Sequence, residues 1–592
     1  MDIKNRVSAL KKEMEKENID LYYIPTDDDH MSEYIADHFK VRQYMSGFTG
    51  SAGMLVIGKE SILWADGRYY IQAERQLKNS GIKLYKMGMA NVCSVFDYLV
   101  ENSKNKVIGF DGKVVSADFV KRLKKATKDN GTSIKLDNDL VDRIWQDRPA
   151  MPDSEAFILN DKYTGNSISE KIEMVRKDLR DNKCDALVVS ALEDVAWLFN
   201  LRGDDIKCTP VNYAYALVTD KDVMLFIDEK KINDSVLNVL TKNKVLVFAY
   251  EKIADKLQEL NGKVWVDTTK LNAYLFDKIT GDIYDDASPI AMYRAIKNKT
   301  EIKCTKNAHV KDGVAMCKFI YWLKSNIGKM EMSEISVQNK LYELRAQMDD
   351  YLEPSFNTIC AYEANAAMMH YSASEQSNAV LDTKGFLLVD SGGTYYDGTT
   401  DITRTICLGK IDDKDRLYYT TVLKAMLNLQ GAKFLEGTTG ANLDILARGV
   451  VWDLDIDYQC GTGHGVGHVL SVHEGPHSIR WSNNGPAMKY VLKEGMIVTD
   501  EPGIYLPNDL GIRIENELLV VKGKKNEYGQ FMYFEPLTMC PIDLDAVDVN
   551  IMSDRELKLL NDYHELVYKN VSPYLNDKEK LWLKMQTRKL VR

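Results

Sequence analysis

Hydrophobic and polar positions follow one another along the first half of the chain in a pattern that occurs twice. In the first copy, an amphipathic helix carries Val7, Leu10 and Met14 on one side and leads into an apolar strand at residues 21–25. In the second copy, a helix at residues 172–181 leads into the strand CDALVVS in the same way. Because helices that alternate with buried strands are typical of α/β domains, the pattern predicts two of them in tandem.

Aspartates occupy matching positions in the two copies. Asp20 aligns with Asp185 at an offset of 165 residues, and Asp66 aligns with Asp228 at an offset of 162 residues. A nearly constant offset indicates an internal repeat. We therefore predict two similar α/β domains that arose by duplication, at residues 1–153 and 154–296.

Two short motifs in the first copy contain residue types that also occur in ligand sites. The glycine-rich loop SGFTGSAG at residues 46–53 lacks the Lys-Ser/Thr ending of a phosphate-binding P-loop, and the second copy has no comparable loop. The run DDDH at residues 27–30 has metal-ligand side chains, but it precedes a segment at residues 31–39 that we expect to be helical. Capping of that helix is therefore the interpretation we favour over a metal site.

From residue 297 onward the pattern changes. We expect a long amphipathic helix at residues 300–324, a second helix at residues 333–347, and then segments rich in strands. The last region begins with a capping box, SDRE from Ser553, and has the composition of helices with a basic last turn. The sequence thus predicts a third, α+β domain at residues 297–592 that ends in a helical extension.

Composition narrows the class of protein. The 592 residues exceed what one hydrophobic core supports, which agrees with several domains. The net charge of −10 argues against a nucleic-acid partner, and no run of apolar residues is long enough to span a membrane. The nine cysteines contain no C-x-x-C pair, which indicates reduced thiols. We therefore expect a cytoplasmic protein that binds neither nucleic acid nor membranes.

The third domain has two aspartates on strands that we expect to be neighbours in a hairpin. A buried strand at residues 386–390 ends on Asp390, and a second strand at residues 399–407 contains Asp401. The two aspartates are eleven positions apart, an offset that can place both carboxylates at one point across a hairpin. Side chains alternate along the second strand, so one side presents Asp401, Thr403 and Thr405, and the other presents Ile402, Arg404 and Ile406.

Further candidate ligands follow within residues 461–515. The segments GTGHGVGH, VHEGP, TDEPG and IRIEN contain His464, His473, Glu501 and Glu515. Arg513 lies two residues before Glu515 on the same side of its strand, so it can orient the carboxylates from behind. Carboxylate oxygens with a little imidazole are the ligands that hard divalent metals prefer.

The charge of this group favours two metals over one. Four carboxylates that lie together raise one another's pKa, and two divalent cations cancel their charge. With one metal the site would keep about two negative charges. A water molecule that bridges two such metals becomes a hydroxide nucleophile near neutral pH, so the residues predict a hydrolytic site with two metals.

The motifs DSGGTYYDGTTDITRT, GTGHGVGHVLSVHEGP, TDEPG and GIRIEN resemble those of the pita-bread metallopeptidases, and specifically of the aminopeptidase P (Xaa-Pro aminopeptidase) family. The resemblance extends to SGFTGSAG, DGRYY, VAWLFNLRG and FEPLT, and so covers nearly the whole chain. It implies the long three-domain form, with two creatinase-like α/β domains before a pita-bread catalytic domain. The resemblance to this cytosolic form further implies a homodimer, in which the N-terminal domain would help to wall the active site.

The resemblance also implies roles for individual residues. The metal ligands would be Asp390, Asp401, His464, Glu501 and Glu515. They would hold two metal ions, usually manganese, with Asp401 and Glu515 bridging the pair. His370 and His473 match the family's substrate-binding and proton-handling histidines, and we count Glu501 and Arg513 with the catalytic residues. The implied reaction releases the N-terminal residue from peptides with proline in second position, by attack of the bridging hydroxide.

One position departs from the family pattern, and other functions remain as alternatives. Relatives often carry a histidine four residues before the ligand His464, where this chain has Cys460, and His468 is a candidate to compensate. The alternatives are an Xaa-Pro dipeptidase, a methionine aminopeptidase, a pita-bread peptide-binding protein without activity, and a metal-free creatinase-like hydrolase. The two N-terminal domains disfavour the methionine enzyme, and the complete ligand set disfavours the last two.

Overall fold

The computed structural model describes residues 1–137, 139–481 and 485–592. The chain divides into two compact units. The N-terminal unit comprises Met1–Asn160 and Asn166–Ala291, and the catalytic unit comprises Asp161–Gly165 and Met292–Arg592. Within the described residues, no helix has the length and apolar character needed to cross a membrane.

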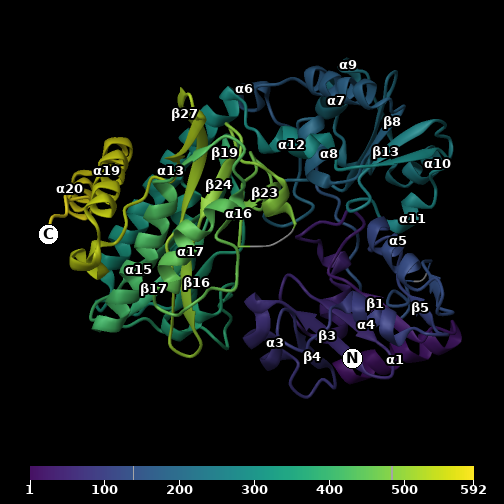
Figure 1. The fold of residues 1–592 in the computed structure, drawn as a ribbon, viewed down its shortest axis with the longest axis horizontal. Helices are drawn as coiled ribbons and strands as arrows, with labels where there is room; N and C mark the ends of the chain where they lie inside the picture. The colour runs from purple at the N-terminus through teal and green to yellow at the C-terminus, as the bar shows by residue number, and fades with distance from the viewer. Residues whose placement is uncertain (138, 482–484) are drawn as a thin grey trace. The chain divides into compact units, whose positions relative to one another are not determined.

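The N-terminal unit contains two six-stranded sheets with the same topology (Figure 1). In each sheet the central strand pairs antiparallel with one neighbour and parallel with the other, and the outer strands on both sides pair parallel. The first sheet has the order β4 (Lys83–Lys86), β3 (Ser61–Ala65), β2 (Met54–Ile57), β1 (Leu21–Ile24), β5 (Val107–Gly109), β6 (Ser133–Lys135). The second has the order β12 (Val245–Phe248), β11 (Val223–Ile227), β10 (Ala214–Thr219), β8 (Ala186–Val189), β13 (Lys263–Val266), β14 (Asp282–Asp285).

The aspartates at matching positions of the repeat make the same kind of hydrogen bond in both copies. The Asp20 carboxylate accepts the main-chain N–H of Val107 at 2.8 Å, and the Asp185 carboxylate accepts that of Lys263 at 2.7 Å. Each therefore fastens the central strand to the strand beside it. Asp66 and Asp228 each cap a short 3-10 turn by accepting the N–H two residues on. The predicted tandem of similar α/β domains is confirmed.

Amphipathic helices cover the two sheets. Their apolar residues, such as Leu10 and Met14 of the first helix, are buried against the strands, as the periodicity predicted. The helices are α1 (Ile3–Lys16), α2 (Val41–Ser46), α3 (Tyr70–Gln76), α4 (Val95–Asn102), α5 (Ala117–Ala126), α7 (Ile168–Asn182), α8 (Leu192–Leu198), α9 (Asp234–Lys242), α10 (Ile253–Gln258) and α11 (Ala273–Phe276). A short ribbon of β7 (Phe157–Ile158) and β9 (Leu201–Arg202) completes the unit.

The expectation that DDDH caps a helix is wrong. The Asp28 carboxylate accepts the N–H groups of His30 at 2.9 Å and Ser32 at 3.0 Å, which closes a turn instead of starting a helix. Met31 adopts a φ of 56°, a left-handed conformation that interrupts any helix at this point. Of the predicted helix at residues 31–39, only the 3-10 turn Asp37–Phe39 forms.

The catalytic unit contains the long helices that the sequence predicted. Helix α13 spans Lys299–Asn326 and α14 spans Glu334–Arg345, close to the expected residues 300–324 and 333–347. The capping box at Ser553 starts α19 (Asp554–Val571). The remaining helices are α6 (Asp161–Thr164), α12 (Pro289–Ala295), which leads into the unit, α15 (Asp413–Gln430), α16 (Gly440–Leu443), α17 (Ile445–Trp452), α18 (Pro486–Lys489) and α20 (Asp577–Gln586).

Four sheets supply the strands of the catalytic unit. The largest has the order β21 (Lys433–Leu435), β28 (Gly529–Pro536), β27 (Asn516–Asn526), β24 (Ile497–Asp500), β22 (Gly463–Gly465), β23 (Glu474–Ile479). A second joins β16 (Ile359–Tyr362), β17 (Phe386–Ser391) and β20 (Ile402–Cys407). The smaller sheets are β15 (Tyr351–Pro354) with β18 (Gly393–Tyr395) and β19 (Gly398–Thr399), and β25 (Gly503–Leu506) with β26 (Leu510–Arg513).

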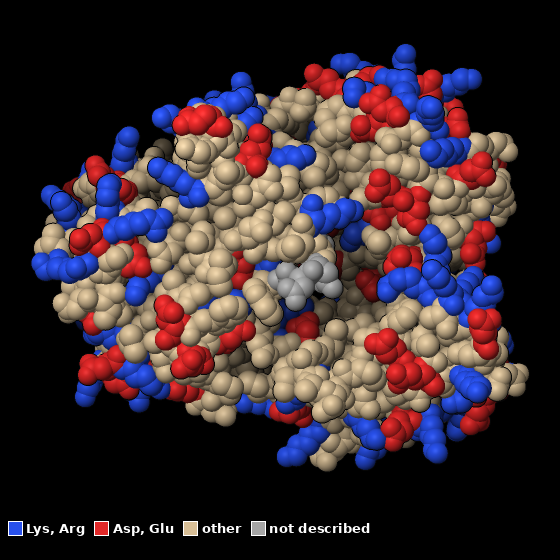
Figure 2. Space-filling model, in the orientation of Figure 1, with Lys and Arg blue, Asp and Glu red and all other residues tan. Residues whose placement is uncertain are grey.

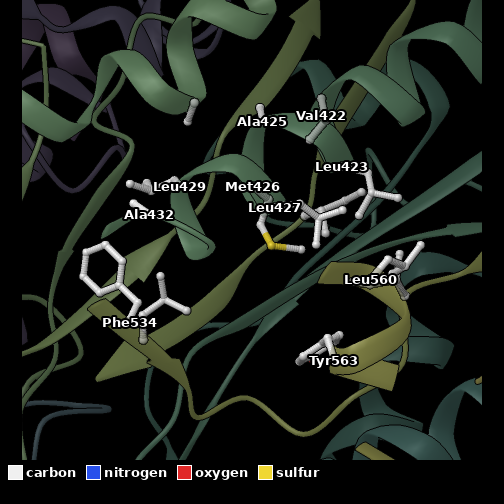
Figure 3. Packing of buried hydrophobic residues seen from close by; sticks show 14 of the residues in the cluster. Val422, Leu423, Ala425, Met426, Leu427, Leu429, Ala432, Phe534, Leu560 and Tyr563 are labelled. Atoms are coloured by element: carbon white, nitrogen blue, oxygen red, sulfur yellow. The ribbon is translucent and has the colours of Figure 1, made fainter. Parts of the chain in front are cut away.

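The core of the catalytic unit lies between the strands and three of its helices. Helix α15 contributes a continuous apolar face that packs against the largest sheet, and α17 and α19 lie beside it. Figure 3 shows this packing, with Leu423, Met426 and Leu429 of α15 near Phe534 of β28 and near Leu560 and Tyr563 of α19. This core supports the largest sheet, which carries part of the candidate site.

Candidate metal centre

The five predicted ligands lie in or next to strands of the two larger sheets of the catalytic unit. Their positions are Asp390 near the end of β17, Asp401 just before β20, His464 within β22, Glu501 just after β24, and Glu515 between β26 and β27. Strands β17 and β20 are antiparallel neighbours, and Asp390 is paired with Thr403 across them. Strands β22, β24 and β27 belong to the largest sheet.

Short distances connect these side chains. His464 Nε2 lies 3.4 Å from an Asp401 carboxylate oxygen and 3.3 Å from a Glu501 carboxylate oxygen. One ligand atom each from Asp401, His464 and Glu515 all lie within 4.8 Å of one another, close enough to hold one metal ion between them. The Asp390 carboxylate joins the group through Arg513, whose guanidinium donates to it at 2.5 Å.

Buried carboxylates of this group lie close to one another, and burial and proximity together raise the pKa values of two of them. Burial raises the pKa of Asp390 to about 6, against the opposing charge of Arg513, and the charges of Asp401 and Glu501 add to the shift. Burial and the same neighbours raise the pKa of Glu515 well above its ordinary value. A positive ion between these side chains would offset both the burial of the charges and the repulsion between the carboxylates.

The donor set fits a hard divalent metal. One oxygen of Asp390 and one of Glu515 are buried without a hydrogen-bond partner in the described part of the chain. His464 Nδ1 lies 2.8 Å from the Gly465 carbonyl oxygen, and a proton held there would leave Nε2, which faces the carboxylates, as the nitrogen available to a metal. Oxygen-rich ligands with one imidazole suit manganese or a similar cation.

Several side chains that hold the ligands in place have no obvious signal in the sequence. The Thr403 hydroxyl donates to Glu515 at 2.7 Å and accepts from Arg513 at 3.1 Å, and Glu517 accepts the main-chain N–H of Asp401 at 2.6 Å. Arg513 also donates to the Tyr505 hydroxyl at 2.6 Å. The predicted role of Arg513 behind the carboxylates thus agrees with its contacts. The sequence analysis did not identify Glu517, and its two-residue spacing from Glu515 is the one signal that could have indicated it.

The two histidines that were expected to face the substrate lie at the edge of this group. The His473 ring packs edge-on against the His464 ring, with centroids 4.3 Å apart. His370 is half-buried and follows Met369, whose carbonyl oxygen lies 3.4 Å from an Arg513 nitrogen. His473 therefore contacts a predicted ligand, whereas His370 follows a residue that contacts Arg513, and neither belongs to the set Asp401, His464 and Glu515 that converges on one point.

Family models match the chain in the same order as its domains. Two matches to a creatinase/prolidase N-terminal domain cover residues 6–144 and 147–301. Metallopeptidase family M24 covers residues 303–522, and the C-terminal region of peptidase M24 covers residues 530–590. The predicted fold class, two similar α/β domains before a pita-bread catalytic domain, is confirmed. The predicted boundaries after residues 153 and 296 stay predictions.

Comparison with whole proteins decides the family. The chain is 38% identical to a probable Xaa-Pro aminopeptidase P of Pyrenophora teres f. teres, over 99% of this chain and 93% of the relative. This chain belongs to the aminopeptidase P family. It is also 36% identical to the Xaa-Pro aminopeptidase 1 of Dictyostelium discoideum, over 99% and 97% of the two chains. The family resemblance read from the sequence is confirmed, and the chain is a metallopeptidase of the aminopeptidase type.

A solved member of the aminopeptidase P family has the same architecture. The X-prolyl aminopeptidase of Caenorhabditis elegans, described as a cytosolic enzyme with a di-nuclear active site, superimposes with a TM-score of 0.95 at 32% identity. The match covers 100% of both chains. A Xaa-Pro dipeptidase from Bacillus anthracis matches 64% of this chain with a TM-score of 0.51. The long three-domain form of the aminopeptidase P family is therefore the better structural match.

Cys460 occupies the position where the aminopeptidase P pattern often has histidine. Burial and the charge of Glu501 raise the pKa of the thiol to about 12, so it stays protonated at neutral pH. His468 does not stand in for the absent histidine. Its ring nitrogens lie 3.2 Å from the Thr305 hydroxyl and 3.0 Å from the Tyr163 carbonyl oxygen, and the side chain is buried.

Proposed function

We propose that this chain releases the N-terminal residue from peptides that have proline in second position. The observation that carries the proposal is the convergence of Asp401, His464 and Glu515 within 4.8 Å, next to Asp390 and Glu501, in a chain that matches Xaa-Pro aminopeptidases over its full length. The substrate is a peptide whose free N-terminus enters the site.

Five residues hold two divalent cations, which we propose are Mn²⁺. They would be Asp390, Asp401, His464, Glu501 and Glu515, of which Asp401 and Glu515 would each serve both ions. Bound there, the cations would supply Lewis-acid chemistry for the scissile carbonyl and a water-derived nucleophile near neutral pH. The four carboxylates balance the four positive charges, and Arg513 keeps the Asp390 carboxylate in one orientation by donating to it at 2.5 Å.

His370 and His473 handle the substrate. An imidazole N–H placed beside the scissile carbonyl stabilises the negative charge that develops on its oxygen. The second task is delivery of a proton to the proline nitrogen as it leaves, which an imidazole with a pKa near neutrality performs well. The contact of the His473 ring with the ligand His464 at 4.3 Å supports a place beside the reacting atoms. Glu501 and Arg513 complete the catalytic residues.

We also propose that the protein is a homodimer that works in the cytoplasm. Helices α16 and α17 and strand β23 underlie a face on which few charged side chains gather (Figure 2). Large apolar side chains with exposures from 38% to 57% occupy this part of the catalytic unit, namely Ile445, Leu446, Trp452, Trp481 and Met488. An apolar patch of this kind fits a second copy of the chain. None of the nine cysteines, all within the described residues, forms a disulfide, which suits a reducing compartment.

Matched peptides test the proposed reaction. Purified protein with Mn²⁺ is given Xaa-Pro-Xaa tripeptides, Xaa-Ala-Xaa tripeptides of the same length, and Xaa-Pro dipeptides. We expect release of the first residue from the proline tripeptides alone. Cleavage of dipeptides only would favour the prolidase-like alternative, and no cleavage of any peptide would favour a binding protein.

Sedimentation tests the proposed dimer separately. The double substitution Leu446→Asp and Trp481→Ser places charge and removes apolar area on the patch without touching the ligands. We expect the variant to sediment as a monomer while the wild type sediments as a dimer. A wild-type monomer at micromolar concentration would contradict the dimer and leave the proposed reaction unaffected.

A further inference from the structure

Arg404 is a buried arginine directly behind the ligand cluster. Its side chain is 1% exposed, and every nitrogen of its guanidinium group donates a hydrogen bond. The acceptors are the carbonyl oxygens of Thr403 at 2.9 Å, Glu515 at 2.5 Å, Cys540 at 2.8 Å and Pro541 at 3.1 Å, the Asn516 amide oxygen at 2.9 Å and the Tyr563 hydroxyl at 2.8 Å. We call Arg404, Asn516 and Tyr563 the Arg404 hub.

The charge of Arg404 has no carboxylate partner. Among the described residues, none of its hydrogen bonds or ion pairs is to an aspartate or glutamate side chain. A buried cation without an anion is costly, so such a charge persists where it offsets negative charge nearby. The acid closest along its contacts is Glu515, whose carbonyl oxygen it binds and whose carboxylate is a predicted bridging ligand.

The Arg404 hub also joins the strands that present the ligands. Arg404 lies in β20, three residues after Asp401, and binds the main chain at Glu515. Asn516 pairs with Asp500 across β27 and β24, immediately before the ligand Glu501. The positions of three ligands therefore depend on main-chain segments that meet at one guanidinium group.

The C-terminal region supplies the other side of the hub. The Tyr563 hydroxyl, which comes from α19, accepts from Arg404 at 2.8 Å and donates to the Cys540 carbonyl oxygen at 2.7 Å. Tyr563 is 2% exposed and lies in the core beside α15 (Figure 3). Its hydroxyl group is one of the acceptors that together hold the guanidinium in one orientation, since arginine donates within the plane of its fork.

We propose that Arg404 is a positioning residue of the metal centre, which fixes the main chain at Glu515 and places a permanent positive charge behind the carboxylates, and that α19 holds it there through Tyr563. The inference rests on the proposed two-metal site. It assigns to the C-terminal region a part in metal binding, although none of the predicted ligands comes from that region.

The test measures metal affinity rather than activity. Metal-free protein is titrated with Mn²⁺ alone, and the melting temperature of the metal-free form is recorded in parallel. Tyr563→Phe removes only the hydroxyl group, and we expect it to weaken Mn²⁺ binding by about 10-fold, the lower end of the effect of residues that orient ligands. Arg404→Met should weaken binding by about 100-fold, and Arg404→Lys, which keeps the charge, by less than Arg404→Met.

A matched control separates positioning from general stability. Tyr419 is also a fully buried tyrosine of the catalytic unit, and its hydroxyl donates to the Asp543 carbonyl oxygen at 2.9 Å instead of bonding a residue of the hub. Tyr419→Phe should lower the melting temperature about as much as Tyr563→Phe and leave Mn²⁺ affinity unchanged. Equal Mn²⁺ affinity of Tyr563→Phe and wild type would overturn the inference, even if Arg404→Met does not fold. A wild-type protein that binds no Mn²⁺ would instead overturn the proposed metal site.

Discussion

The molecule buries groups of acidic side chains in two places, and the two groups are satisfied differently. In the N-terminal unit, Asp28 accepts two main-chain N–H groups and the Tyr213 hydroxyl at 2.8 Å. Asp29 accepts the Tyr250 hydroxyl on one oxygen, and its other oxygen is buried without a hydrogen bond among the described residues, 3.7 Å from His30 Nε2. In the catalytic unit, Asp390 and Glu515 each keep a buried oxygen without a donor among the described residues. We call these the N-terminal acidic group (residues 27–29) and the ligand group (Asp390, Asp401, Glu501, Glu515).

The difference lies in what neutralises the negative charge. Tyrosine hydroxyls and main-chain N–H groups stabilise a carboxylate by hydrogen bonds and need no ion. Oxygens that face other carboxylates have no donors to satisfy them and therefore need cations. Residue type does not distinguish the two groups, since DDDH contains the same kinds of side chain as the metal site. The hydrogen-bond donors around the carboxylates distinguish them.

Removal of metal should have the largest effect, and it should affect the ligand group but not the N-terminal acidic group. Exhaustive chelation is expected to abolish peptide hydrolysis and to lower the melting temperature, because the ligand group is left with uncompensated charge. Added Mn²⁺ or Co²⁺ should restore both. Differential scanning calorimetry with a peptidase assay measures the two effects. Full turnover by protein shown to be metal-free would contradict the need for cations.

Loss of a bridging ligand comes next. Asp401→Ala or Glu515→Ala is expected to remove both metals, because each side chain would serve both ions, while His464→Ala should weaken mainly one. Elemental analysis of dialysed protein gives the metal count. Asp28→Ala in the N-terminal acidic group is the control and should keep the wild-type count. Two metals per chain in Asp401→Ala would refute the bridging assignment.

Substitution of the two histidines that we assign to the substrate should reduce the catalytic rate and leave the metal content of the protein unchanged. His370→Ala and His473→Ala are each expected to reduce kcat by an amount that corresponds to about 2.7–4 kcal/mol, the usual loss when one donor to a developing oxyanion is removed. Metal content and melting temperature should match wild type. Steady-state kinetics on one Xaa-Pro tripeptide measures the effect. A drop in metal content in either variant would move that histidine into the ligand group.

The N-terminal acidic group should matter for stability alone. Asp28→Ala leaves the Tyr213 hydroxyl and two main-chain N–H groups buried without an acceptor, and each unsatisfied group costs about 1–3 kcal/mol. Asp28→Asn keeps one oxygen as an acceptor for the N–H groups and should lose less. Urea unfolding followed by tryptophan fluorescence gives the free energies of unfolding. A change in Mn²⁺ affinity in either variant would break the distinction between the groups.

The parts of this account that the sequence predicted are those encoded locally. The paired aspartates Asp20 and Asp185 and the helix α13 follow from periodicity, and the predicted ligands stand at strand ends within short motifs. The Arg404 hub could not be predicted, because Arg404 contacts Cys540 and Tyr563 at separations of 136 and 159 residues. Periodicity placed Arg404 on the side opposite Thr403 and gave no partner for it. The prediction for the DDDH run was wrong for a similar reason, since the tyrosine that donates to Asp28 is the distant Tyr213.

The smallest effect is expected at Cys460, which lies near the ligand group and carries no charge. Because burial and Glu501 raise the pKa of its thiol to about 12, the side chain neither adds to the carboxylate charge nor offsets it at neutral pH. Cys460→Ala should therefore change kcat/KM by less than about threefold, which is under 1 kcal/mol. Cys460→His introduces the residue that relatives often carry and should be tolerated, with kcat/KM equal to or above wild type. Both variants are compared with His370→Ala on the same peptide, with metal content checked in each. If Cys460→Ala were as damaging as His370→Ala, the thiol would take part in the reaction, and charge would not be what separates the active residues around the ligand group from the inactive ones.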